Sequence, residues 1–182
     1  MAVVEALQTQ YLEADATSVT FTDIPATYEH LQLRMSAKTD STDMDSIGGE
    51  AAFGAFRMNG ITGTNYAYVR MEAYGDEDVG GAGGNQSELF CARFATVGEP
   101  TSGFSSRPAF YGGVVLDILD YVNTDKMTTV MCVSGTSGPI NVSLDGGVFN
   151  NNLTVHTILI DQSGGSNWVR GSVFTLYGWN SS

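Results

Sequence analysis

Residues Leu153 to Trp179 read LTVHTILIDQSGGSNWVRGSVFTLYGW, and this stretch decides the fold class. It contains two apolar runs rich in β-branched and aromatic residues, separated by a segment of Ser, Gly and Asn from Ser163 to Asn167. Apolar runs separated in this way are typical of an antiparallel hairpin. Apolar side chains fall on both faces of each run, which predicts that the two strands lie centrally, with little of either face in water.

The rest of the chain repeats this strand-like pattern. From Leu31 to Lys38, apolar and polar residues alternate strictly, which predicts a strand with Leu31, Leu33, Met35 and Ala37 on its buried face. Further runs of strand character are Val19 to Thr22, Phe53 to Asn59, Asn65 to Tyr74, Leu89 to Thr96, Phe110 to Tyr121, Lys126 to Ser134 and Ile140 to Leu144. No amphipathic helix is evident. About eight to ten short strands at this spacing predict an all-β protein, an antiparallel sandwich or a barrel.

Two segments between these runs carry specific expectations. The turn dipeptide Asn59-Gly60 within NGITGTN joins two strands, because both residues tolerate positive φ. The segment Gly75 to Glu88, GDEDVGGAGGNQSE, is predicted to be a flexible loop, because glycine loses much backbone entropy on ordering.

The strand between these segments has two chemically different faces. Tyr66, Tyr68, Arg70 and Glu72 share one face. The other face consists of Ala67, Val69, Met71 and Ala73, and its apolar character makes these four residues the better core candidates.

Length and charge limit the function classes. The 182 residues suit one domain, Ser18 to Ser182, preceded by a first strand or an N-terminal arm at Met1 to Thr17. The formal net charge of -12 disfavours binding to nucleic acid and to an anionic membrane surface. The N-terminal sequence MAVVEALQTQ has no basic region, so no secretory signal is expected and the chain is expected to be made in a cytoplasm.

The two cysteines, Cys91 and Cys132, lie in apolar strand-like runs. We expect two buried free thiols that act as small hydrophobic side chains. A disulfide between them is the alternative, but nothing else in the sequence indicates export.

The sequence contains no pattern that indicates an enzyme, a cofactor site or a metal site. Asp40, Asp43 and Asp45 could offer oxygen ligands to Ca²⁺, but their spacing lacks the EF-hand pattern and favours a solvated acidic loop. The two histidines, His30 and His156, have no partners at zinc-ligand spacing, and no G-x-S-x-G motif is present. Both histidines are therefore interpreted as structural.

Aromatic residues are the candidate interaction surface. Tyr66, Tyr68 and Tyr74 fall on one face of a strand, and Trp168 and Trp179 flank the last strand. Such a surface can stack on sugar rings or bury against a neighbouring subunit. Ordinary packing within the sheet is the alternative reading.

Three segments together resemble a set of tailed-bacteriophage virion proteins. They are SVTFTDIPATYEHLQLRMSAKT, FRMNGITGTNYAYVRMEAYG and TVHTILIDQSGGSNWVRGSVFTLYGW. In that set a strand pair of the form S-x-T-F-x-x-I-P-x-T-Y-x-x-L-x-L comes first, an F-N-G-x-x-G-x-N-Y hairpin follows, and a G-S-x-F-x-L-Y-G strand ends the domain. The likeness extends over roughly Ser18 to Trp179, although the insert Gly75 to Glu88 is longer than the family pattern implies.

The resemblance implies a jelly-roll-like β-sandwich that serves as a structural protein of the phage particle. The expected role is a capsid decoration (cement) protein in the virion, bound to the major capsid protein and forming a homotrimer at a threefold axis. The alternative is a receptor-binding module of a tail fibre or tail tip that recognises host surface glycans through Tyr66, Tyr68 and Trp168. Catalytic residues, cofactors and metals are not expected in either role.

Overall fold

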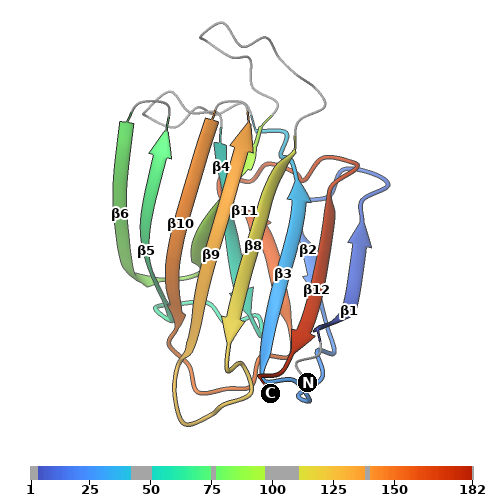
Figure 1. Ribbon diagram of the computed structural model, residues 1–182, viewed down its shortest axis with the longest axis vertical. Coiled ribbons are helices and arrows are strands. Elements are labelled where there is room, and N and C mark those ends of the chain that lie inside the picture. Colours follow the sequence, from blue (N-terminus) through green and yellow to red (C-terminus); the bar gives the residue numbers. More distant parts are fainter. Residues whose placement is uncertain (1–3, 42–50, 75–76, 97–110, 138–139, 182) are drawn as a thin grey trace, which may run out of the picture.

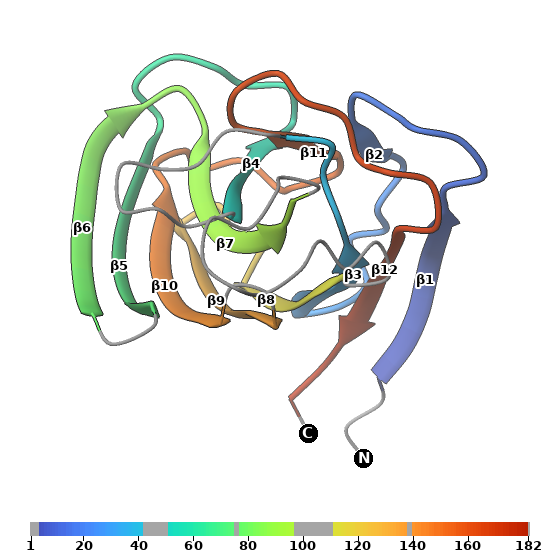
Figure 2. The same cartoon turned by 90° about the horizontal axis from the view of Figure 1, so that it is seen from above.

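The computed structural model describes residues 4–41, 51–74, 77–96, 111–137 and 140–181. These residues form an all-β fold of twelve strands in two antiparallel sheets, and they contain no helix that could span a membrane. Figure 1 shows the larger sheet in front of the smaller one, and Figure 2 shows the larger sheet arcing around it. The predicted β-sandwich is confirmed, although with more strands than expected.

The larger sheet has eight strands and the smaller sheet has four. In spatial order the larger sheet contains β1 (Val4–Tyr11), β12 (Val173–Trp179), β3 (His30–Ala37), β8 (Gly112–Leu119), β9 (Thr128–Ser137), β10 (Ile140–Phe149), β5 (Tyr66–Tyr74) and β6 (Glu77–Gln86). The smaller sheet contains β2 (Val19–Phe21), β11 (Ile158–Gln162), β4 (Ala51–Met58) and β7 (Leu89–Ala95).

The chain winds as a jelly roll with two added hairpins. Strands β1 to β4 alternate between the two sheets, and β7, β8, β11 and β12 complete the winding. The hairpins β5–β6 and β9–β10 are inserted into this path, and both add their strands to the larger sheet. The larger sheet is therefore a four-stranded jelly-roll sheet extended by four further strands (Figure 1).

The predicted hairpin at the C-terminal end is wrong in its pairing. The strand β11 pairs with β2 and β4, whereas β12 pairs with β1 and β3 in the other sheet. The intervening segment crosses between the sheets, where Gly164, Gly165 and Gly171 have positive φ and the Trp168 side chain is fully buried. Each strand has a neighbour on both sides, so the expectation that both lie centrally is confirmed.

The turn Asn59-Gly60 forms as expected, with φ of 55° and 65°. It does not close a hairpin, because β4 and β5 belong to different sheets. The Asn59 side chain ties the turn to the segment before β11. Its Nδ2 donates to the Thr154 carbonyl at 2.8 Å, and its Oδ1 accepts from the His156 amide at 2.9 Å.

The expected flexible loop from Gly75 to Glu88 is also wrong over most of its length. Residues Glu77–Gln86 form β6, the edge strand beside β5. Backbone hydrogen bonds need no side chains, and the Tyr68 ring occupies the space above Gly83, within 2.6 Å of where a Cβ would lie. At the opposite edge, β1 pairs with β12, so the N-terminal segment contains a first strand, Val4–Tyr11.

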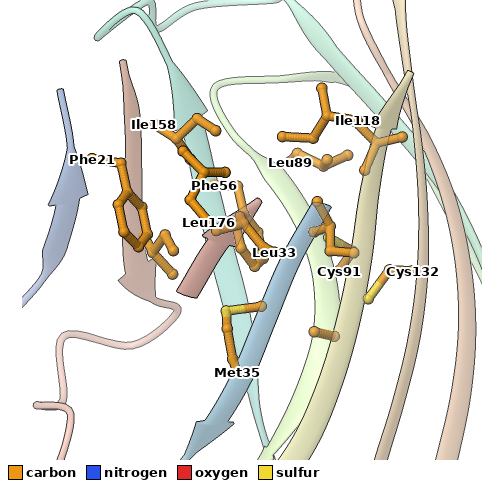
Figure 3. Packing of buried hydrophobic residues seen from close by; sticks show 14 of the residues in the cluster. Phe21, Leu33, Met35, Phe56, Leu89, Cys91, Ile118, Cys132, Ile158 and Leu176 are labelled. Atoms are coloured by element: carbon orange, nitrogen blue, oxygen red, sulfur yellow. The ribbon is translucent and has the colours of Figure 1, made fainter. Parts of the chain in front are cut away.

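The core lies between the sheets. Figure 3 shows Phe21, Phe56 and Ile158 from the smaller sheet packed with Leu33 and Leu176 from the larger one. The alternation in β3 holds as predicted, because Leu31, Leu33, Met35 and Ala37 are all at most 4 % exposed. Lys38 follows the end of β3 and is buried, and burial lowers its pKa.

Candidate assembly surface

The strand β5 is oriented opposite to the prediction. Val69 and Met71 are 57 % and 68 % exposed, whereas Arg70 and Glu72 are each 8 % exposed. The strand therefore turns its polar face towards the smaller sheet and its apolar face outwards. The expectation that Val69 and Met71 belong to the core is wrong.

The neighbouring strand β10 has the same inverted arrangement. Asn141, Ser143 and Asp145 are at most 2 % exposed, whereas Val142 and Leu144 are 55 % and 48 % exposed. The two strands pair directly, with Leu144 opposite Met71 and Asp145 opposite Arg70. Their polar residues consequently meet inside the sandwich.

Mutual pairing explains why these polar residues are buried. Arg70 Nε donates to Asp145 Oδ1 at 2.7 Å, while Asp145 Oδ2 accepts from Ser143 Oγ at 2.7 Å and from the Ala92 amide at 3.1 Å. A buried carboxylate needs such partners, because an unpaired charge in the interior is very costly. The hydrogen bonds to Ser143 and Ala92 therefore hold Asp145 in place beneath β7.

A second ion pair lies beside the first. Arg93 of β7 donates from Nε and Nη2 to the two carboxylate oxygens of Glu72, at 2.8 and 2.9 Å. Burial opposes ionisation of Glu72, but the bonds from Arg93 prevail and lower the pKa of Glu72. The Phe53 ring lies within 3.7 Å of the Arg70 guanidinium and 3.5 Å of the Arg93 guanidinium, measured to the ring centroid. Both cations therefore gain an aromatic contact.

The inversion leaves a broad apolar surface on the outer face of the larger sheet. Of the eleven large apolar side chains exposed in the described residues, seven lie there. They come from four adjacent strands and are Val69, Met71, Val115, Met131, Val133, Val142 and Leu144. We call this set the outer apolar face. In Figure 1 its strands β5, β10, β9 and β8 lie side by side towards the viewer.

Strand register places these residues in three cross-strand rows. The central row is Arg34, Val115, Val133, Leu144 and Met71. One flanking row is Asp117, Met131, Gly146 and Val69, and the other is Gly113, Gly135, Val142 and Ala73. From β9 to β5 these rows contain no charged side chain. Charged side chains appear at the border of the face, Arg34 on β3 and Asp117 on β8. Gln32 links these two residues, because it accepts from Arg34 Nε at 2.7 Å and donates to Asp117 Oδ1 at 2.8 Å.

A groove crosses one side of this face. It has a volume of about 630 Å³, and its walls include Arg34, Val115, Val133, Val142 and Thr175. Gly113 and Gly135 line it as well, and their missing side chains keep it open. Beside it, towards β5, Leu144 and Met71 are exposed and do not line the groove. The face thus combines an apolar groove with exposed apolar side chains next to it.

The candidate aromatic residues do not gather on an exposed surface. Tyr66 is 1 % exposed, and its hydroxyl accepts from the Met58 amide at 2.9 Å. Trp168 is fully buried and packs edge-on against Phe94, with ring centroids 4.7 Å apart. Both are core residues, because each connects elements of the two sheets.

The other three aromatic candidates are separated. Tyr68 is half-buried on the inner face of β5, 6.1 Å from the Phe90 ring. Trp179 is half-buried at the far side of the sheet, where its ring lies 4.3 Å from that of His30. The backbone of Tyr74 pairs with Asn141 and Glu77, and its side chain lies outside the described part.

The acidic candidates have structural partners where they are described. Asp40 accepts from the amide and the Nδ2 of Asn167, at 2.6 and 2.7 Å. These hydrogen bonds link the segment after β3 to the segment that crosses between the two sheets before β12. Asp43 and Asp45 lie outside the described residues.

Within the described ranges, the structure brings together one group with metal-ligand character, Glu29, His30 and Asp120. His30 Nδ1 accepts from the Asp120 amide at 2.9 Å, Asp120 pairs with Lys126, and Glu29 accepts from the Ser181 amide at 2.9 Å. Hydrogen bonds from the Ser181 hydroxyl and amide lower the pKa of Glu29, and the hydrogen bond from Lys126 lowers the pKa of Asp120. The three side chains therefore stabilise the segment after β12 and the turn after β8. The other histidine, His156, is exposed.

The two cysteines face each other across the sandwich. Cys91 of β7 and Cys132 of β9 are free thiols, each 1 % exposed. Burial, together with the neighbouring Cys132, raises the pKa of the Cys91 thiol. Figure 3 shows both residues in the core, where they act as small apolar side chains.

No protein-family model matches the chain, and no curated protein is significantly similar to it. In the described residues, the outer apolar face is the largest group of exposed apolar side chains, and it is the candidate assembly surface. The sequence pattern placed two of its side chains, Val69 and Met71, in the core, and the missed signal was the charged residues on the alternate positions of β5 and β10.

Proposed function

We propose that this protein is a structural component of a tailed-phage particle, a capsid decoration protein that binds the major capsid shell as a symmetric oligomer. The observation that carries this proposal is the outer apolar face. Apolar patches of several hundred Å² on a folded surface mark interaction sites. A chain that buries two ion pairs and exposes seven large apolar side chains on one face is suited to assembly.

The fold, the strand motifs and the net charge also support the proposal. Jelly-roll sandwiches recur among capsid proteins, and the strand motifs of the chain resemble those of phage virion proteins. The net charge of -12 favours solubility before assembly, since like-charged copies repel one another. On this proposal the chain is made in the host cytoplasm and acts in the virion.

The glycan-binding alternative has less support. Sugar recognition needs exposed aromatic rings beside polar groups, whereas Tyr66 and Trp168 are buried. The groove on the outer face is lined mainly by valine and glycine. It therefore suits an apolar protein surface better than a sugar.

The test is binding to empty shells of the phage that encodes the chain. We expect the purified protein to co-sediment with the shells and to saturate at a ratio set by the shell symmetry. Leu144→Lys should reduce binding strongly, because a charge in the outer apolar face disrupts the symmetric oligomer that binds the shell. The control is Leu153→Lys, since Leu153 is equally exposed at 48 % but lies in the loop before β11. Failure of the wild-type protein to co-sediment would contradict the proposal.

A further inference from the structure

We propose that the outer apolar face binds a second copy of this chain, so that two sheets pack face to face around a two-fold axis. This inference deepens the proposed function and rests on it, because it names the first partner of the assembly surface. Four observations carry it: the charge of the face, its relief, its area and its place in the fold.

The charge of the face fits a second copy. Two chains that each carry -12 repel, so they can associate only through surfaces from which charge is absent or balanced. The outer apolar face meets this condition, because its three rows are uncharged from β9 to β5. At its border Arg34 and Asp117 carry opposite charges. A strongly basic partner would instead require acidic residues on this face.

The groove and the exposed side chains beside it suit a second copy. The groove lies towards β3 and β8, while Leu144 and Met71 are exposed beside it towards β5. A two-fold axis that lies between them and runs along the strands places these two side chains of each copy over the groove of the other. The same surface then serves both partners, as in an isologous interface.

The area is sufficient for a dimer that dissociates on dilution. Five strands from β3 to β5, at about 4.8 Å each, and three rows of about 6.8 Å give roughly 500 Å² per copy. Two copies then bury about 1,000 Å², the lower limit for a specific interface. We therefore expect a measurable monomer–dimer equilibrium rather than a permanent dimer.

The place of the face in the fold also favours this partner. Six of its seven residues lie on the inserted strands β5, β9 and β10, and the jelly-roll winding is complete without these strands. The hairpins thus widen one sheet and supply its apolar outer side. A threefold trimer needs two different contact surfaces on each copy, whereas the described residues show one continuous apolar face, which favours two-fold pairing.

The test is sedimentation of the isolated protein over a wide concentration range, with no shells present. We expect a dimer at high concentration that dissociates on dilution and persists in high salt, since salt screens the repulsion between copies. Leu144→Lys should be monomeric throughout, and Leu153→Lys should behave as wild type. Val133→Thr keeps the side-chain shape and should raise the dissociation constant several-fold. Circular dichroism and thermal unfolding then show whether each variant remains folded.

The outcomes separate this inference from the proposed function. A protein that is monomeric at every concentration but binds shells overturns the inference and leaves the function standing. A dimer that fails to bind shells overturns the function and supports the inference. A trimer, or an equal loss of dimer in Leu144→Lys and Leu153→Lys, overturns the two-fold arrangement through this face.

Discussion

At the scale of single residues, the buried ion pairs decide which side of β5 faces the core. Alternation in the sequence shows that β5 has two different faces, but it does not show which one is buried. Arg70 finds its partner Asp145 on β10, far along the chain, and Glu72 finds Arg93 on β7. Since these contacts depend on the tertiary fold, the sequence pattern assigned the wrong face to the core.

The Glu72–Arg93 pair makes a stability prediction. Glu72→Gln removes the carboxylate that accepts two hydrogen bonds from the buried Arg93 guanidinium, which should lower the free energy of unfolding at pH 7 by about 3–5 kcal/mol. Urea unfolding measures this change. The control is Glu13→Gln, which alters an exposed glutamate and should have little effect. An equally small effect of both substitutions would contradict the role assigned to the pair.

The same residue sets the sign of a pH dependence. The pKa of Glu72 in the folded protein lies below its ordinary value of 4.5, so the unfolded chain takes up this proton first as the pH falls. The stabilisation from Glu72 is therefore fully present above about pH 5 and is lost as the pH falls through the lower folded-state pKa. Glu72→Gln should accordingly flatten the acid limb of the stability curve measured in the same urea experiments.

At the scale of elements, strands were predictable but their partners were not. The alternation of β3 and the apolar runs of β11 and β12 identify strands, because strand periodicity is a local property. Which strands pair with each other depends on the path of the segment that connects them. The Gly-rich segment between β11 and β12 is equally compatible with a hairpin and with a crossing, and the burial of Trp168 between the sheets accompanies the crossing.

The edge strand β6 shows how composition can mislead. Its glycines suggested a flexible loop, yet the strand pairs with β5 along most of its length. An alanine Cβ at Gly83 would come within 2.6 Å of the Tyr68 ring, whereas a Cβ at Gly81 would meet nothing within 4 Å. The two positions therefore form a matched pair for testing the contact with Tyr68.

We expect Gly83→Ala to displace the Tyr68 ring and to cost about 1 kcal/mol, in the range found for overpacked sites. Amide hydrogen exchange should accelerate in β6. Gly81→Ala should leave stability and exchange close to wild type. If both variants exchange alike, Tyr68 does not hold this edge.

At the scale of the whole molecule, the fold places two buried ion pairs on the inner side of β5 and β10 and an apolar face on the outer side of the same strands. The jelly-roll winding supplies the core, and the inserted hairpins supply the outer apolar face. The strand pattern of the sequence predicts the sandwich, but it does not predict this surface. Val69, Met71, Val142 and Leu144 look like core residues until their buried polar neighbours are known.

Oxidative footprinting of methionines tests whether the outer apolar face becomes buried on assembly. Met71 and Met131 lie on the face and are 68 % and 51 % exposed, while Met127 is 47 % exposed in the turn before β9 and serves as an internal control. We predict that Met71 and Met131 are oxidised readily in dilute protein and strongly protected in the assembled state, with Met127 unchanged. Equal oxidation of all three methionines before and after assembly would contradict the account.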